Sequence, residues 1–243
     1  MSRADREGRQ GQTVVIAIDG PAASGKSSTA HWVASVLGYL HVDSGALYRA
    51  VTASALRAGP DPSQWDESDV LGAAAAVSLT PSVTSFVPCL DGVDAAEEIR
   101  GAEVTRHVSR VAQMPRVRAW VNERVRAAAL QRDVVVDGRD IGTTVFPNAD
   151  LKVFLVADPW ERARRRLTQR LGRRPTDGEV AEETDRLVHR DAQDATQTVQ
   201  AKDAVLIDTT SLTQSEQVDR IVALARAVTQ RASGTSSIDS SMD

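Results

Sequence analysis

Apolar residues along this chain gather in five short runs, which are separated by longer segments with a helical spacing of apolar positions. The runs are rich in β-branched residues, which is typical of strands that are buried on both faces of a sheet. Strands that alternate with helices predict an α/β fold with a five-stranded parallel sheet and helices on both faces. The five predicted strands lie at residues 14–18, 39–42, 134–136, 151–156 and 204–207.

The pattern changes between residues 77 and 93, where strand-like runs are short and are joined by turn residues. Such a stretch predicts a small β-rich insert within the α/β chain. Helical spacing resumes over residues 95–129 and is broken near Pro115. The polar residues 1–12 and the Ser-rich residues 232–243 lack a comparable pattern, and we expect both tails to be disordered.

Composition restricts the classes of partner. The chain has 243 residues and a net charge of −4, so no nucleic-acid partner is expected. It contains no apolar run long enough to cross a bilayer, so no membrane partner is expected. Its one cysteine, Cys89, excludes an intramolecular disulfide, and we interpret it as a small buried side chain. The four histidines have no close metal-ligand spacing.

The first predicted strand leads into a loop with the pattern G-x-x-x-x-G-K-S, which runs from Gly20 to Ser27. Backbone N–H groups of such a loop surround phosphate oxygens, and the following helix N-terminus favours the same anion. Lys26 can reach the outer phosphates, and the Ser27 hydroxyl can ligate Mg²⁺. A chance match in a turn is the alternative, which the strand–loop–helix context disfavours. The predicted triphosphate site comprises Gly20, Pro21, Ala22, Ala23, Ser24, Gly25, Lys26, Ser27 and Ser28.

Charged residues also follow the strand at 134–136. Asp137, Arg139 and Asp140 surround Gly138. Because ligands bind at the carboxyl ends of parallel strands, these side chains are candidate ligand-binding groups. The alternative is a salt-bridged turn, since ion-pair networks also occupy such places.

A third set of polar residues follows the strand at 39–42. Ser44 and Tyr48 are four residues apart, so one helix face can present both side chains. Arg49 can hold a phosphate through a bidentate contact. The alternative is a helix cap with a surface arginine.

The segment that follows the fourth strand is rich in arginine. Asp158, Pro159 and Glu161 predict a helix start with a capping box. We expect this segment to form a mobile lid that stabilises charge on a phosphoryl group and excludes water. The alternative is a solvated surface that nearby glutamates neutralise. The arginines that share one predicted helix face are Arg162, Arg165 and Arg166.

Together these segments resemble the bacterial cytidylate kinases, which belong to the nucleoside monophosphate kinases. The resemblance covers residues 13–228 and implies a P-loop kinase fold that catalyses ATP + CMP ⇌ ADP + CDP, with dCMP as a second substrate and Mg²⁺ as the cofactor. The matching segments are IDGPAASGKSS from Ile18, DSGALYR from Asp43, EIRGAEV from Glu98, VSRVAQMPRVR from Val108, VVDGRDIGTTVFP from Val135, ERARRR from Glu161 and AVLIDTT from Ala204.

Matching positions carry the family's residue roles to this chain. The implied catalytic residues are Lys26, Asp137, Arg139 and Arg165. The implied Mg²⁺ ligand is Ser27, and the loop from Gly20 to Ser28 would bind ATP. The implied CMP-binding residues are Ser44 and Tyr48 at the pocket wall, Arg49 and Arg139 at the phosphate, Ser109, Arg118 and Asp140 at the cytosine, and Arg190 and Asp194 at the ribose.

The resemblance also implies a division of the domain at residues 13–231. A core at 13–59 and 132–231 would carry a monophosphate-binding insert at about 60–131 and a lid at about 162–195. We expect a cytoplasmic monomer whose partners are ATP and CMP or dCMP.

One segment departs from the family pattern R-D-x-x-D-S-T-R, which a proline-containing turn follows. Arg190 and Asp194 match, but Gln197 stands where the family arginine contacts phosphate. Losing a charged hydrogen bond costs roughly 1.5–3 kcal/mol, or about ten- to a hundredfold in rate. We hypothesise that Arg173 or Arg174 replaces the missing charge.

Two alternative functions follow from this departure. The first is a kinase for a modified pyrimidine monophosphate or another small molecule on the same fold. The second is a nucleotide-binding regulatory protein with low turnover. A P-loop GTPase is disfavoured because no N-K-x-D segment is present to read guanine.

Overall fold

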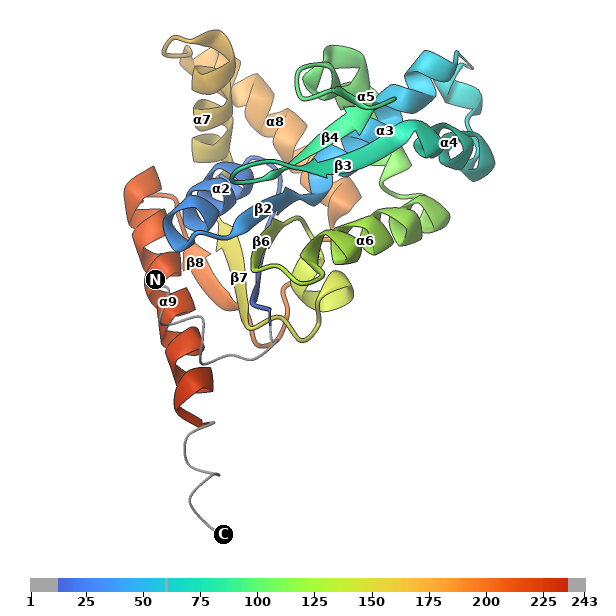
Figure 1. Ribbon diagram of the computed structural model, residues 1–243. Coiled ribbons are helices and arrows are strands. Elements are labelled where there is room, and N and C mark those ends of the chain that lie inside the picture. The colour runs from blue at the N-terminus through green and yellow to red at the C-terminus, as the bar shows by residue number, and fades with distance from the viewer. Residues whose placement is uncertain (1–12, 60, 236–243) are drawn as a thin grey trace.

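The computed structural model describes residues 13–59 and 61–235 and contains a central parallel sheet (Figure 1). Its strands are β1 Val15–Asp19, β2 Leu40–Asp43, β6 Val134–Asp137, β7 Leu151–Val156 and β8 Val205–Asp208. They lie in the order β2-β6-β1-β7-β8. This sheet confirms the predicted α/β fold and all five predicted strands.

Helices cover both faces of the sheet (Figure 1). Ile16 and Ile18 of β1 pack in one core, whereas Ala17 between them packs in the other. This alternation buries the strand on both faces, as its continuous apolar run predicts. The first core includes α2 Lys26–Leu37 and α9 Gln214–Thr235, and the second includes α3 Ser44–Ala58 and α6 Pro115–Ala129.

Strand register brings the polar segments together at one edge. Asp137 at the end of β6 lies opposite Asp43 of β2 on one side and Ile18 of β1 on the other. The loop of residues 20–25 and α2 follow β1 directly. The candidate residues that follow three separate strands therefore meet at the carboxyl edge of the sheet.

The predicted β-rich insert is present as a three-stranded antiparallel sheet in the order β3-β4-β5. Trp65, Leu90 and Val108 of this region pack in the same core as α3. Cys89 is buried in β4, which confirms its interpretation as a small buried side chain. The elements here are α4 Glu67–Ala73, β3 Val77–Pro81, β4 Phe86–Leu90, β5 Val93–Asp94, α5 Ala102–Val111 and short helical turns at Pro62–Gln64, Ala74–Ala76 and Glu98–Arg100.

The arginine-rich segment forms a pair of helices, α7 Pro159–Leu171 and α8 Asp177–Asp194. Leu167 of α7 and Leu187 of α8 belong to a small core of their own, together with Ala22 of the loop after β1. This core fixes the helix pair against the loop. A π-helical turn, Ile141–Val145, follows β6.

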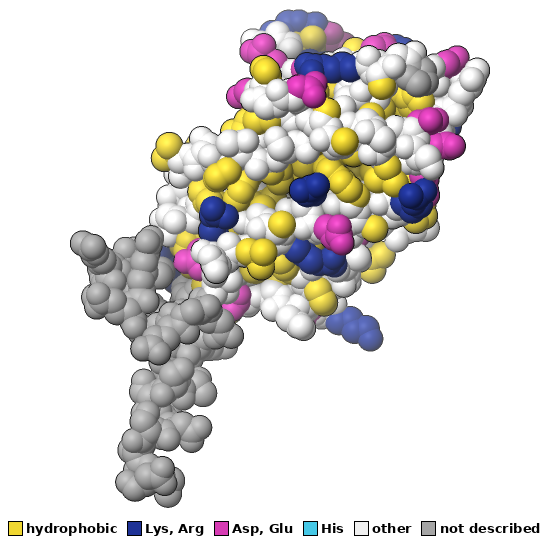
Figure 2. Space-filling view, turned by 45° about the vertical axis from the view of Figure 1, so that its right-hand side comes forward, with side chains coloured by type: hydrophobic (Ala, Val, Ile, Leu, Met, Phe, Trp, Pro, Cys, Tyr) yellow, Lys and Arg dark blue, Asp and Glu magenta, His cyan; other side chains and the backbone are white. Residues whose placement is uncertain are grey.

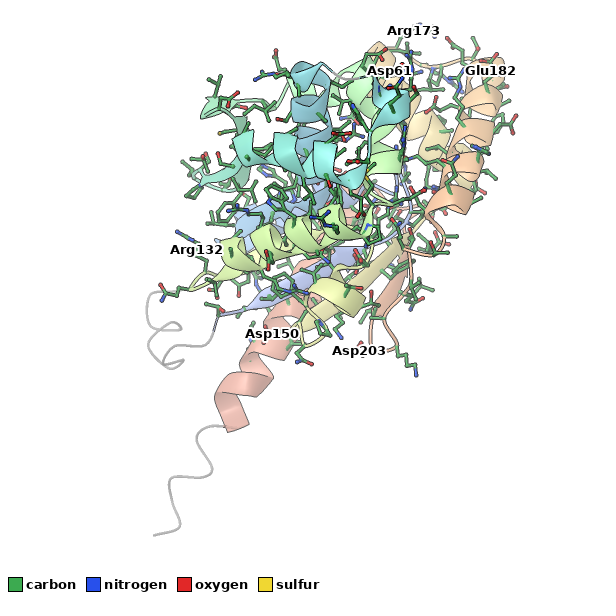
Figure 3. The ribbon with its side chains drawn as sticks, turned by 90° about the vertical axis from the view of Figure 1, so that its right-hand side faces the viewer. Asp61, Arg132, Asp150, Arg173, Glu182 and Asp203 are labelled. Carbon is green, nitrogen blue, oxygen red and sulfur yellow. The ribbon has the colours of Figure 1, made fainter. Side chains whose placement is uncertain are left out.

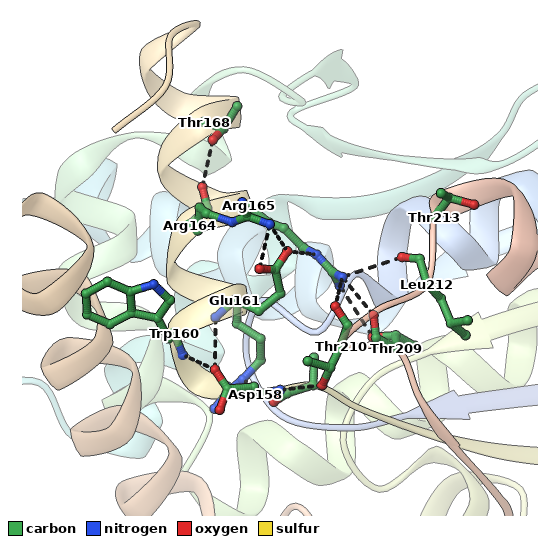
Figure 4. A network of polar contacts seen from close by, with 12 residues as sticks. Asp158, Trp160, Glu161, Arg164, Arg165, Thr168, Thr209, Thr210, Leu212 and Thr213 are labelled. Atoms are coloured by element: carbon green, nitrogen blue, oxygen red, sulfur yellow. Dashed lines mark hydrogen bonds and ion pairs between the residues drawn. The ribbon is translucent and has the colours of Figure 1, made fainter. Parts of the chain in front are cut away.

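The predicted capping box at the start of α7 is wrong in one half. Asp158 accepts hydrogen bonds from the backbone N–H groups of Trp160 and Glu161, as expected for a cap. The Glu161 carboxylate does not return a bond to the cap, because it accepts from Arg164 and Arg165 instead (Figure 4). Two guanidinium donors compete better for a carboxylate than one backbone N–H.

The last helix is longer than its pattern predicts. Thr213 and Glu216 form the expected reciprocal cap, but α9 continues to Thr235. Adding residues to an existing helix costs little, which explains the extension past residue 231. The other residues of the two predicted tails, 1–12 and 236–243, lie outside the described residues.

The surface carries charges of both signs. On the face in Figure 2, Lys and Arg side chains are interspersed with acidic and apolar ones. None of the helices in the described ranges combines the length and apolar character that a membrane crossing requires.

Candidate functional site

A cavity of about 1410 Å³ opens at the carboxyl edge of the sheet. Pockets for one small molecule typically measure about 300–1,000 Å³, so this cavity has room for two ligands. All predicted site residues line it except Gly20 and Pro21 at the start of the loop. The predicted residues that line it are Ala22, Ala23, Ser24, Gly25, Lys26, Ser27, Ser28, Ser44, Tyr48, Arg49, Ser109, Arg118, Asp137, Arg139, Asp140, Arg165, Arg190 and Asp194.

The loop after β1 closes around Lys26. Its Nζ donates to the backbone oxygen of Pro21 at 2.6 Å and lies 3.5 Å from the Ser24 hydroxyl. Gly25 has a φ of +87° at the N-cap of α2, a conformation that favours glycine. Burial, with the nearby charge of Arg139, lowers the pKa of Lys26 to about 8. The loop therefore presents a half-buried cation beside backbone N–H groups, as a phosphate site requires.

Oxygen atoms suited to a hard cation lie beside this lysine. The Ser27 hydroxyl donates to Asp137 Oδ2 at 2.6 Å. Within the described ranges, no cluster of three or more His, Cys, Asp or Glu side chains could hold a metal. Mg²⁺ is commonly bound by one or two protein oxygens plus substrate phosphates, so Ser27 and Asp137 fit that ion.

His41 is part of this cluster, and sequence reasoning missed it. Its Nε2 lies 2.7 Å from Asp137 Oδ1, and its side chain is buried. Burial alone would lower the pKa of His41, but the hydrogen bond and charge of Asp137 and the charge of Asp43 raise it overall. The signal available in the sequence was a histidine within the apolar strand at residues 39–42, two residues before Asp43.

Several arginines line the cavity, and two of them form ion pairs with carboxylates. Arg139 Nη2 lies 2.7 Å from Asp194 Oδ2, and Arg118 pairs with Asp140. Arg49 Nη1 donates to Thr105 Oγ1 at 3.1 Å. Burial, with the charge of Arg190, lowers the pKa of Arg49 to about 10, so this side chain stays charged at neutral pH.

Tyr48 supplies a separate sign of a missing ligand. Its hydroxyl is buried and has no hydrogen-bond partner among the described residues. Burial raises the pKa of Tyr48 to about 12, so the hydroxyl keeps its proton. A buried polar atom without a partner is costly, and a polar ligand in this cavity would relieve that cost.

The three arginines predicted to share a helix face all lie in α7, but their surroundings differ. Arg165 lines the cavity and donates from Nη2 to the backbone oxygens of Thr209 and Thr210 at 2.7 and 2.9 Å (Figure 4). Arg166 also lines it and pairs with Glu183. Arg162 is instead buried and does not line the cavity, and it donates to the backbone oxygen of Ala22.

The hypothesis that a lid arginine replaces the missing charge has no geometric support. Arg173 lies at the turn between α7 and α8 and pairs with Glu179 at 2.6 Å (Figure 3). Neither Arg173 nor Arg174 lines the cavity. Gln197 does line it, and its Oε1 accepts from Arg118 Nη1 at 3.0 Å.

Known proteins are similar to this chain over most of its length. The family model for cytidylate kinase matches residues 16–227. Cytidylate kinase from Desulfitobacterium hafniense (strain Y51) is 46% identical over 212 residues, which cover 86% of this chain and 91% of that protein. Cytidylate kinase from Limosilactobacillus fermentum is 43% identical over 213 residues, which cover 86% of this chain and 93% of that protein.

Proposed function

This chain belongs to the cytidylate kinase family, and we propose that it transfers the terminal phosphoryl group of ATP to CMP or dCMP, giving ADP and CDP or dCDP. The observation that carries the proposal is one cavity in which a phosphate loop faces the Arg118–Asp140 pair. The two alternatives from the sequence, a kinase for another acceptor and a low-turnover regulatory protein, are not favoured. Membership of this family gives the chain the P-loop kinase fold that the resemblance implies.

ATP binds with its phosphates in the loop of residues 20–28, and Lys26 contacts the outer phosphates. Ser27 and Asp137 would hold Mg²⁺, and that ion would supply charge neutralisation on the phosphate oxygens. Lys26 has a counter-charge nearby in Asp137, and it therefore remains available as a cation at neutral pH. This arrangement serves as the donor half of the site.

The acceptor nucleotide lies between the arginines and the base-reading pair. Arg49 and Arg139 bring two positive charges to its phosphate, and Arg190 with Asp194 lies at its ribose. Cytosine presents an amino donor beside ring acceptors, whereas uracil presents an oxygen in place of the amino group. The Asp140 carboxylate accepts from that amino group, and Arg118 donates to the acceptors. A uracil oxygen facing Asp140 would place two acceptors against each other with no proton between them, which is the basis of selection.

The reaction needs no general base, because the second phosphate pKa near 6 leaves the acceptor phosphate largely dianionic at neutral pH. Catalysis therefore rests on positioning and on charge neutralisation by Lys26, Arg139 and Arg165. To reach the phosphates, Arg165 exchanges its bonds to the backbone oxygens of residues 209 and 210. Closure of α7 and α8 over the cavity would exclude water as a competing acceptor.

A coupled assay of ADP release with CMP, dCMP, UMP, AMP and a modified CMP tests the proposal. We expect kcat/KM for CMP and dCMP to exceed that for UMP and AMP by about 100-fold or more. Preference for the modified nucleotide would support the alternative acceptor. Absence of any acceptor-dependent ADP release would support the low-turnover protein. We also propose a cytoplasmic protein that acts as a monomer, and the residues that line the cavity, all from one chain, support the monomer.

The pH profile should reveal the ionisation of Lys26. Its pKa of about 8 means that the side chain is charged below this pH and neutral above it. We therefore expect kcat/KM for ATP, which reports the free enzyme, to fall as pH rises above about 8. In Lys26→Arg the guanidinium stays charged, so the fall should disappear at a lower absolute rate. The same fall in Lys26→Arg would assign it to another group.

A further inference from the structure

Arg118 stands at a junction of four chain segments. It belongs to α6, and it contacts Asp140 after β6, the end of α5 and the segment after α8. Its Nη1 donates to Ala112 O at 3.1 Å and to Gln197 Oε1 at 3.0 Å, while Nη2 pairs with Asp140. Its Cζ lies 6.0 Å from the centre of the Tyr48 ring.

The contacts at Nη1 and at Nη2 restrict the Arg118 guanidinium in different ways. Asp140 engages Nη2 alone, so this pair does not fix the plane of the group. The acceptors at Nη1 define that plane, because a guanidinium directs its N–H groups in a rigid planar fork. Ala112 O is a backbone atom, so a residue of any type at this position would supply it. Gln197 is therefore the side chain that specifies the orientation at Nη1.

The same short segment also holds the other arginine of the acceptor site. Asp194 pairs with Arg139, and Thr198 Oγ1 lies 3.5 Å from Arg139 Nη1. Gln197 lies between these two residues, and all three follow or end α8. Residues at and after the end of α8 thus contact both Arg118, on the base side, and Arg139, on the phosphate side.

We propose that Gln197 is a positioning residue whose amide oxygen holds Arg118 in the orientation that, together with Asp140, distinguishes cytosine from uracil. The inference rests on the proposed function and adds a role for a residue that does not itself touch the base. A residue that merely bound the acceptor phosphate would affect CMP and UMP alike. A residue that orients Arg118 affects the ratio between them.

The test compares Gln197→Met, which keeps the side-chain length and loses the acceptor, with Gln197→Glu, which keeps an acceptor for the guanidinium. Gln200→Met is the matched control, because Gln200 is exposed on the same segment and does not line the cavity. The measured quantities are kcat and KM for CMP and UMP, KM for ATP, and the dissociation constant of CMP from calorimetry.

In Gln197→Met we expect KM and the dissociation constant for CMP to rise about tenfold, in line with loss of a hydrogen bond to a charged group. The ratio of kcat/KM for CMP to that for UMP should fall by a similar factor, while kcat and KM for ATP stay within about twofold. Gln197→Glu should restore the ratio, and Gln200→Met should leave it unchanged.

An unchanged ratio in Gln197→Met, or equal losses in Gln200→Met, would overturn the inference while wild-type preference for CMP upheld the proposed function. Failure of Gln197→Glu to restore the ratio would also overturn it, because the acceptor atom is then not what matters. If the wild-type protein showed no preference for CMP, the proposed function and the inference would both be refuted.

Discussion

Replacing Lys26 with methionine is expected to lower kcat by about 100- to 1,000-fold, the usual loss when one preorganised charged donor is removed from a transition state. Methionine keeps the length and packing of the side chain but removes the ammonium that lies 2.6 Å from Pro21 O in the centre of the loop. The fold should survive, because the loss of a half-buried charge removes its desolvation cost. Coupled measurement of ADP release with CMP gives kcat, and thermal unfolding gives stability.

Lys152→Met is the matched control. Lys152 is a buried lysine as well as a charged one, but it binds Asp203 at 2.9 Å and does not line the cavity. Its replacement should lower the melting temperature and leave kcat unchanged. A Lys26→Met enzyme with near wild-type turnover would show that the loop does not neutralise the transferring phosphoryl group. Equal kinetic losses in both variants would instead indicate general disruption.

Local sequence patterns were sufficient for the sheet and the phosphate loop. Continuous β-branched runs specify strands that are buried on both faces, and Ile16, Ala17 and Ile18 do point alternately into two cores. The spacing from Gly20 to Ser27 identifies the loop because each position has a defined backbone or side-chain task. These features depend on neighbours in sequence, which a pattern can show.

The contacts of individual arginines could not be predicted in this way. Arg162 and Arg165 share a helix face by spacing, yet one binds the phosphate loop and the other the strand-end segment after β8. Arg118 and Gln197 are 79 residues apart in sequence, and nothing local pairs them. A long charged side chain takes whichever acceptor the fold brings near, so its partner is a tertiary property.

The acceptor site also shows why carboxylates accompany its arginines. Arg118 and Arg139 each have a carboxylate partner within the cavity wall, so neither is an uncompensated buried charge. The same pairing holds each guanidinium at the cavity wall before a ligand arrives, which reduces the ordering cost of binding. Stability and recognition therefore depend on the same ion pairs at this site.

Gly20→Ala is expected to disturb both stability and catalysis. The backbone at Gly20 has a φ of +150°, and a Cβ there would lie 2.2 Å from Leu155 O in the neighbouring strand β7. A backbone oxygen within the sheet cannot move aside, so the loop must shift. Left-handed strain alone costs about 1–3 kcal/mol, and the added clash should bring the loss of melting temperature to about 10 °C. Displacing the loop by about 1 Å should lower kcat/KM about 100-fold or more.

Gly59→Ala separates strain from the clash. Gly59 has a φ of +94°, but a Cβ there would meet nothing within 4 Å. This variant should lose about 1–2 kcal/mol of stability, a few degrees of melting temperature, and no catalytic rate. Calorimetry and the coupled assay measure both variants under the same conditions. Wild-type kinetics in Gly20→Ala would contradict the argument that close packing of Gly20 on β7 holds the phosphate loop, because the clash would then have relaxed without moving Lys26.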